Sequence, residues 1–277
     1  MTAPQSPLAF RDYRLFWIAR FSAVLAQVGM VVVIGWQAYD VARTDYGMGP
    51  KAAAFQLGLI GIAQFLPLLV LMPVAGWMAD RFDRRYVASA AISLDLLNAL
   101  ALGWMTEQGT LNLPALFVVA ALHGVVRAFN GPSLSSIAPN LVPPASLPRA
   151  IAMSSIAWQT GGILGPALGG LAYAAEPASS YWVAAALMAI TTLSILSIRP
   201  YARTSIKGDS HPLRQMIDGL DYVRGHRFLL GAITLDLFAV LLAGATALLP
   251  VYARDILKIG PDGLGWLRGA PAFGATA

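Results

Sequence analysis

Long apolar stretches without charge are the feature that most constrains what this chain can fold into. The run from Leu57 to Ala79 covers 23 positions and the run from Tyr181 to Ile198 covers 18, and neither contains a charged residue. A helix that crosses a membrane needs roughly 20 apolar residues at about 1.5 Å each. The chain is 57% hydrophobic and only 12% charged, about half the charge of an ordinary soluble domain. These values predict an integral membrane protein.

Charge and residue usage exclude several other classes of protein. The net charge of +5 is spread between apolar runs instead of forming a basic stripe with interleaved aromatic residues, so no nucleic-acid partner is expected. With no cysteine and three histidines, the chain offers neither a thiolate metal site nor a nucleophile–base arrangement. We therefore expect no enzyme and no bound cofactor. The first span lacks a cleavage signal and is predicted to be an uncleaved insertion signal.

The apolar runs divide the chain into helical spans. We expect them at 15–41, 57–79, 86–106, 113–137, 150–174, 181–198 and 228–252, with an eighth beginning near Leu264. Helices are predicted because lipid offers backbone groups no partner and the runs are too long for barrel strands. The fold class is an all-α polytopic membrane bundle. Its predicted parts are a six-helix bundle in 1–198, a cytoplasmic linker in 199–227 and the incomplete start of a second bundle in 228–277.

The linker carries an apolar face at helical spacing, with Pro212 suited to the first turn. We expect an amphipathic helix lying on the inner membrane surface; a solvated linker with chance periodicity is the alternative. The residues of this face are Leu213, Met216, Ile217, Leu220 and Val223.

Lysine and arginine fall mostly on one side of the predicted spans. An excess of these residues marks cytoplasmic loops, so the N-terminus is predicted to lie in the cytoplasm, at a bacterial inner membrane. The cytoplasmic side then holds Arg11, Arg14, Arg20, Arg81, Arg84, Arg85, Arg149, Arg199, Arg203, Lys207, Arg214, Arg224 and Arg227, against Arg43, Lys51, Arg254 and Lys258 outside.

The turn between the second and third spans reads GWMADRFDRR, Gly76 to Arg85. This stretch resembles the loop signature G-x-x-x-D-R-x-G-R-R/K of the major facilitator superfamily, with Asp83 in place of the signature's glycine. Six spans, a basic linker and further spans also resemble that family's layout. The resemblance implies twelve spans in two bundles that alternate in access to a central substrate.

In that family the signature cluster latches the two bundles together on the inner side and favours the outward-open state. Here Gly76 is predicted to allow close helix approach, and Asp80 to accept from helix amides or to pair with nearby arginines. The alternative is a turn whose arginines only set topology. The latch candidates are Gly76, Asp80, Arg81, Arg84 and Arg85.

The fourth span contains RAFNG, Arg127 to Gly131, which resembles the family's R-x-x-Q-G motif with Asn130 replacing glutamine. An arginine in mid-membrane costs a few kcal/mol and needs a partner or a wet cavity. Counting from the inner ends places Asp95 about nine and Arg127 about ten residues deep, so the two are predicted to share a level. We interpret them as a proton-linked site, or else as a fixed ion pair. Asp236 is a second candidate proton carrier.

The fifth span reads TGGILGPALGG and is similar to the family's antiporter motif, which is typical of exporters. One ridge of small residues at every fourth position predicts backbone-to-backbone packing, with a second ridge on Gly162 and Gly170. Pro166 removes one helix hydrogen bond. A helix of this kind can seal a bundle interface and slide; ordinary packing is the alternative. The motif residues are Gly161, Gly165, Pro166, Gly169 and Gly170.

Other intramembrane polar residues are weaker candidates. The substrate-cavity candidates are Gln27, Gln37, Asn130 and Gln159, while His123 is interpreted as a packing residue. The segment from Arg127 to Gly170 is similar to the branch that contains enterobactin exporters and macrolide pumps. This resemblance implies export of siderophores, drugs or other amphipathic small molecules, driven by a proton gradient.

The chain provides one predicted bundle and part of another, as a C-terminally truncated member would, so its activity is open at this stage. The main hypothesis is a proton-coupled efflux transporter. The alternative is a non-transporting subunit or an inactive fragment of one. The residues do not indicate an oligomeric state or distinguish a fragment from a natural truncation.

Overall fold

The computed structural model describes residues 6–201, 219, 221–242 and 244–274. These residues form helices and connections, without a strand among them. The six helices before the linker are α1 (Arg11–Thr44), α2 (Pro50–Arg81), α3 (Arg84–Glu107), α4 (Leu113–Ser135), α5 (Leu147–Ala175) and α6 (Pro177–Leu196). Each coincides with a predicted span, so the all-α fold class is confirmed and the first six predicted spans are helical.

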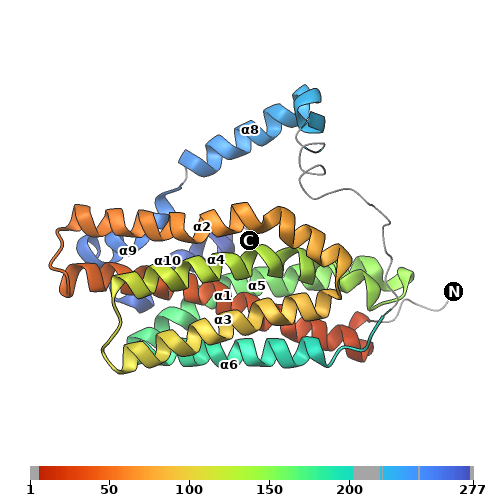
Figure 1. The fold of residues 1–277 in the computed structure, drawn as a ribbon, viewed down its shortest axis with the longest axis horizontal. Helices are drawn as coiled ribbons and strands as arrows, with labels where there is room; N and C mark the ends of the chain where they lie inside the picture. The colour runs from red at the N-terminus through yellow and green to blue at the C-terminus, as the bar shows by residue number, and fades with distance from the viewer. Residues whose placement is uncertain (1–5, 202–218, 220, 243, 275–277) are drawn as a thin grey trace.

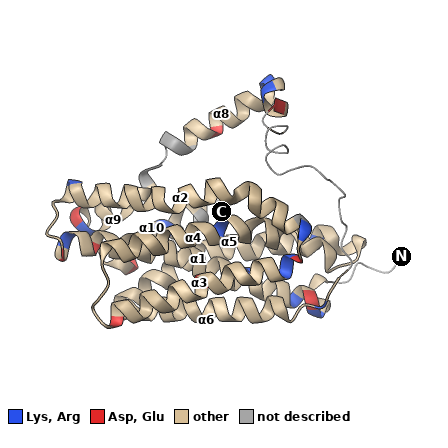
Figure 2. Ribbon diagram, viewed as in Figure 1, with Lys and Arg blue, Asp and Glu red and all other residues tan. Residues whose placement is uncertain are grey.

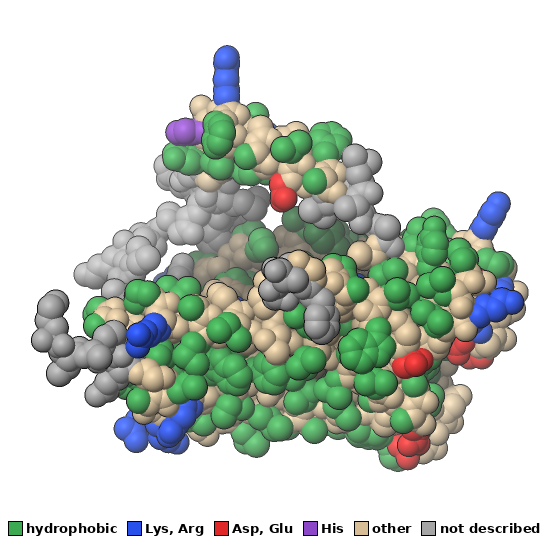
Figure 3. Space-filling model, turned by 180° about the vertical axis from the view of Figure 1, so that it is seen from behind, with side chains coloured by type: hydrophobic (Ala, Val, Ile, Leu, Met, Phe, Trp, Pro, Cys, Tyr) green, Lys and Arg blue, Asp and Glu red, His purple; other side chains and the backbone are tan. Residues whose placement is uncertain are grey.

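The six helices run alternately up and down along one axis (Figure 1). We call the end that holds residues 6–11, 82–85, 136–147 and 197–201 the N-terminal end, and the opposite end, with 45–49, 108–112 and 254–260, the far end. Charged residues gather at these two ends, and the length between them is almost free of charge (Figure 2). Seen from behind, the surface between the ends is mostly hydrophobic (Figure 3). This pattern is that of a bundle whose middle lies in lipid.

Helix α1 forms the centre of the bundle and α2 its margin. Five described helices, α5 not among them, are long and apolar enough to cross a membrane; in α1, 61% of the most apolar window is buried, against 11% in α2. Helix α1 packs on α5 and α6, whereas α2 packs mainly on α4 and α3 on α6. Large side chains such as Tyr13, Phe16 and Met188 fill the interior and are almost fully buried. Helix α1 therefore contacts most of the others.

The predicted seventh span is not one continuous helix. Helix α8 (Arg227–Leu242) is followed by a 3-10 segment (Gly244–Leu248), the short α9 (Leu249–Val251) and a π-helical segment η5 (Tyr252–Ile256). Gly244 has low helix propensity, and Pro250 has no amide hydrogen for the preceding turn. The prediction of one helix over 228–252 was therefore wrong in its second half. The π-helical turn presents Arg254 and Asp255 toward α1.

The last described element is α10 (Pro261–Gly274), which coincides with the predicted eighth span and packs along α5. Helix α8 stands apart from the six-helix bundle (Figure 1). Its described side chains, in 227–239, are exposed except for the partly buried Leu229. The amphipathic helix predicted in the linker lies mostly outside the described residues, of which Gly219 and 221–225 are helical.

Candidate functional site

A buried polar network joins three helices in the middle of the bundle. Asp95 of α3 and His123 of α4 are both fully buried, and a carboxylate oxygen of Asp95 lies 2.7 Å from His123 Nδ1. Gln27 of α1 donates from Nε2 to the other oxygen of Asp95 over 3.4 Å. Asn130 of α4 donates from Nδ2 to Gln27 Oε1 over 3.0 Å. Hydrogen bonds link these four side chains in a row, so a change in the position of Gln27 acts directly on Asp95.

Two atoms of this network keep unused hydrogen-bonding capacity. His123 Nε2 and Asn130 Oδ1 are buried and have no hydrogen-bond partner among the described residues. Leaving such groups unpaired costs free energy, so natural proteins keep few of them, and those few often lie at functional positions.

The predicted pairing of Asp95 with Arg127 was wrong. Asp95 is paired with His123, and Arg127 is exposed on α4. Arg127 follows His123 by one helical turn and is rotated by about 40° from it. Arg268 of α10 is close enough to Arg127 for the two positive charges to interact. The second proton-carrier candidate, Asp236, is exposed on α8.

The interpretation of His123 as a packing residue was incomplete. His123 is buried as expected, but it contacts the carboxylate of Asp95. Depth in the membrane could have identified this pair. Asp95 lies eleven residues after the start of α3, and His123 lies twelve residues before the end of α4, at the same end of the bundle.

Only Gln27 and Asn130 of the four cavity candidates join this network. Gln37 is buried near the far end, bonded to Thr106 and Tyr181, and Gln159 is exposed on α5.

The first glycine ridge of α5 packs directly on the backbone of α1. A Cβ placed on Gly165 would lie 2.8 Å from the carbonyl oxygen of Leu25, and one on Gly169 would lie 3.1 Å from Cα of Gly29. At Gly161 the nearest atom would be Val24 Cγ1 at 2.9 Å. The predicted backbone-to-backbone packing of this ridge is therefore present, and its partner is α1.

The second ridge of α5 packs on α10. A Cβ on Gly170 would lie 2.3 Å from the carbonyl oxygen of Pro261. In the other direction, a Cβ on Gly265 would lie 2.5 Å from the carbonyl oxygen of Pro166. A Cβ on Gly162, the other predicted member of this ridge, would meet no atom within 4 Å among the described residues. Helix α5 is thus sandwiched between the central helix of the bundle and a helix that follows the linker.

The charged turn between α2 and α3 braces the N-terminal end of the bundle. Asp83 caps α3 by accepting from the backbone amide of Arg85, and its carboxylate also binds the Arg85 guanidinium at 2.7 Å. Arg85 further donates to the carbonyl of Ile198. Arg84 donates to the carbonyls of Ala79 and Ser136. The departure from the family signature at Asp83 is therefore a helix cap that holds Arg85.

The outcome differs for the other latch candidates, Gly76, Asp80 and Arg81. The predicted close approach at Gly76 was wrong, because an added Cβ there would meet nothing within 4 Å among the described residues. The side chain of Asp80 lies outside what the structure describes. Arg81 stacks on Trp77, with its guanidinium carbon 5.5 Å from the ring centroid.

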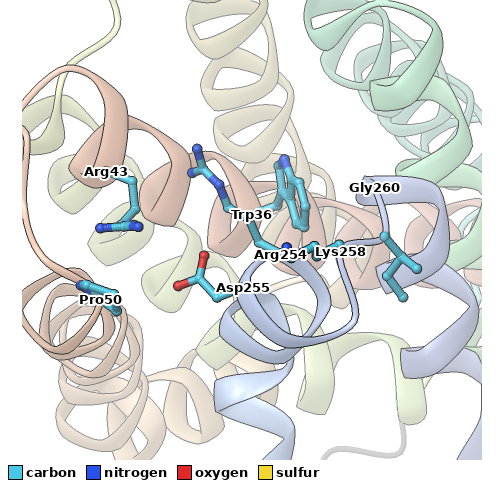
Figure 4. Close-up of a pocket in the computed structure, with 8 residues that line it drawn as sticks. Trp36, Arg43, Pro50, Arg254, Asp255, Lys258 and Gly260 are labelled. Carbon is cyan, nitrogen blue, oxygen red and sulfur yellow. The ribbon is translucent and has the colours of Figure 1, made fainter.

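At the far end, charged side chains of η5 lie beside α1 (Figure 4). Asp40 of α1 forms an ion pair with Arg254 at 2.6 Å, and the Tyr39 hydroxyl donates to the carboxylate of Asp255. A cavity of about 630 Å³ beside them is lined by Trp36, Arg43, Pro50, Arg254, Asp255, Lys258, Ile259 and Gly260. Sequence analysis missed these contacts because they join residues more than 200 positions apart.

Comparison with known proteins places this geometry in a family. The model of the Major Facilitator Superfamily matches residues 15–277. Proteins named MdtD, provisionally described as multidrug resistance proteins, are similar to this chain. That of Salmonella typhimurium strain LT2 is 28% identical over 60% of this chain and 33% of its own length, and that of Escherichia coli O6:H1 is 27% identical over 65% and 37%. The chain thus spans about a third of the length of these relatives.

Solved structures share the fold. A bacterial homolog of the human lysosomal transporter Spinster has a TM-score of 0.69 at 17% identity, over 96% of this chain and 60% of that one. A D-xylose–proton symporter has a TM-score of 0.60 at 14% identity, over 93% and 65%. The family match covers most of the chain, and the helices have membrane-spanning length and composition. This chain is a multi-pass membrane protein and belongs to the Major Facilitator Superfamily.

Proposed function

We propose that this chain forms part of an efflux transporter that exports amphipathic small molecules, such as drugs or siderophores, in exchange for protons. It works by alternating access, with the N-terminal end on the cytoplasmic side of a bacterial inner membrane. The similarity to multidrug-resistance proteins supports drugs as the substrate class. Siderophores are a second candidate, proposed only from the resemblance of the segment from Arg127 to Gly170 to the enterobactin-exporter branch.

The observation that carries this proposal is the position of α5. Its two glycine faces contact α1 within the six-helix bundle and α10 beyond the linker. Contacts made by backbone atoms lack interlocking side chains, so two helices joined in this way can move along each other without repacking a core. Alternating access requires such a surface between the two bundles.

The proposed proton coupling rests on ionisable side chains that lie within the length of the bundle. Asp95, His123 and Arg127 lie away from the helix ends, where an ionisable group is costly and is usually kept for function. The exposed guanidinium of Arg127, close to Arg268 of α10, lies where the two parts of the chain meet. Both arginines stay charged and accept no proton, so Arg127 acts by its positive charge, which disfavours protonation of nearby groups.

The test is transport of ethidium in inverted membrane vesicles that contain the protein, with and without an imposed pH gradient. Gradient-driven ethidium movement is expected for the wild type and a strong loss for Arg127→Ala. Arg14→Ala is the matched control, because Arg14 is an exposed arginine near the start of α1. Movement that ignores the gradient, or an equal loss in both variants, would contradict proton coupling through Arg127.

A further inference from the structure

Asp95 and His123 occupy an unusual place for a pair of ionisable groups. Each lies near the middle of its helix, with at least ten helical residues on either side, and each is fully buried. Burying a carboxylate is unfavourable unless it is paired and hydrogen-bonded. Asp95 meets this condition through His123 and Gln27. His123 is only partly hydrogen-bonded, since its Nε2 has no partner among the described residues.

Few other charges act on this pair. Helix α6 carries no charged residue, and its titratable Tyr181 is bonded to Gln37; α2 has no charge between Lys51 and Asp80. Helix α1 has no charge between Arg20 and Asp40, and α4 adds only the exposed Arg127. Between their ends, these four helices therefore add only the charge of Arg127, one turn from His123.

Helix α1 connects this pair to the glycine face of α5. Leu25 and Gly29 of α1 contact Gly165, and Gln27, between them in sequence, lies on the opposite side of α1 and contacts Asp95. Residues two apart on a helix point in nearly opposite directions, so one stretch of α1 touches both places. A movement of α1 together with α5, relative to α3, changes the hydrogen bond from Gln27 to Asp95.

We propose that Asp95 and His123 together hold the proton exchanged in each transport cycle, and that Gln27 couples this proton to the movement of α1. This inference rests on the proposed function for its physiological role. In the loaded state, an imidazolium at His123 donates from Nδ1 to the carboxylate of Asp95. On release, the N–H bond at Nε2 breaks and the proton passes to water.

The charge balance of this step explains the part played by Gln27. The pair goes from no net charge to one negative charge, and rebinding of a proton reverses the step. The Nε2–H of Gln27 stabilises the negative charge on Asp95 while α1 keeps its present position. When α1 moves and this hydrogen bond is lost, the released state is destabilised more than the loaded state, because only in the loaded state does an imidazolium balance the charge of Asp95. The pair then takes up a proton again.

The first arm of the test uses the whole chain in lipid nanodiscs, labelled with ¹⁵N-histidine. The chain has three histidines, so loss of a signal in His123→Gln assigns that of His123. We expect the His123 Nε2 signal to change between its protonated and deprotonated positions as pH is raised through about 5 to 8, where an unperturbed histidine changes charge. A His123 signal that stays constant over this range would overturn the proposal. This arm needs no transport activity.

The second arm measures pH-gradient-driven ethidium export. Asp95→Asn and His123→Gln are expected to reduce it to the level of empty vesicles. Ser133→Ala is the control, since its fully buried hydroxyl on α4 has no partner among the described residues. Circular dichroism checks that every variant retains its helices. Full export by either variant of the pair, beside gradient-driven export in the wild type, would overturn this proposal and leave the proposed function standing.

The two arms separate the two ideas. If the His123 signal titrates but the wild type shows no gradient-driven export, the proposed function fails and the pair remains a proton-binding site. Gln27→Leu sharpens the result: the titration of His123 is expected to persist while gradient-driven export is lost. Export equal to wild type in this variant would contradict the coupling through α1.

Discussion

The two glycine faces of α5 make the same kind of contact with different partners. Toward α1, the glycines at 161, 165 and 169 pack on a helix that is largely buried within the bundle. Toward α10, Gly170 packs on a helix that begins at Pro261, beyond the linker. Backbone contact alone therefore does not distinguish a fixed interface from a movable one. The surroundings of the two interfaces distinguish them, because α1 also packs against α2, α4 and α6.

The largest expected effect is on the α1 face. Gly165→Leu places side-chain atoms against the backbone of Leu25 and Gly29, which cannot move aside as a side chain could. We expect a loss of at least about 3 kcal/mol in unfolding free energy, at the upper end of overpacking effects. Thermal unfolding in detergent, followed by circular dichroism, measures this loss.

The control on the same helix is Gly162→Leu, where an added Cβ meets no atom within 4 Å among the described residues. Its stability should stay within about 1 kcal/mol of wild type, since leucine also favours helix more than glycine does. Equal destabilisation by both variants would mean that glycine itself, and not its contact with α1, matters at these positions.

The second prediction concerns the α10 face. Gly170→Leu is expected to displace α10 while leaving α1 to α6 folded, because the clash is with the backbone of Pro261. Hydrogen exchange should accelerate by about tenfold or more at α10 amides, as for a locally opened segment. Gly269→Ala should have a weaker effect, since its added Cβ would lie at a less severe 3.1 Å from Ile163 O. Faster exchange throughout α1 would contradict the independence of the two faces.

The third prediction extends the comparison to a charged contact at the N-terminal end of the bundle. Asp83→Ala removes the cap of α3 and the carboxylate that holds Arg85, which is 6% exposed. A cap loss of this kind costs about 1 to 2 kcal/mol. The unfolding midpoint in detergent should fall, with unchanged exchange at α10. Asp83→Asn keeps a capping oxygen and should retain part of the stability; a larger loss than with alanine would refute the cap.

The smallest effect is expected for the charged contact between α1 and η5. The side chains of Asp40 and Arg254 are 37% and 26% exposed, so their ion pair is partly screened by solvent. A double-mutant cycle with Asp40→Asn and Arg254→Gln should give a coupling of about 1 kcal/mol or less, weakening with salt. Local exchange at residues 252–256 measures it. A coupling that salt does not change would show that the pair acts by hydrogen bonding alone.

Sequence periodicity predicted part of this picture well. The apolar runs identified the first six helices, and the spacing of glycines identified the packed face of α5, because both depend on local repeats. The pairing of Asp95 failed because it needed helix ends to within one turn: α4 ends at Ser135, not 137, and α3 begins at Arg84, not 86. With these helix ends, Asp95 lies at the depth of His123 and not at that of Arg127. The contacts of Arg254 and Asp255 with α1 depend on a π-helical turn that no local pattern announced.

The most direct measurement is of distances across the two faces of α5 in lipid nanodiscs, by double electron–electron resonance. The chain has no cysteine, so label pairs can be introduced at exposed residues: Ile18 with Ile156 for α1 and α5, and Leu168 with Trp266 for α5 and α10. The account predicts one narrow distance for the first pair at every condition. For the second it predicts two populations, whose proportions change with ethidium or pH. A fixed second distance, or a first distance that splits with the second, would contradict it.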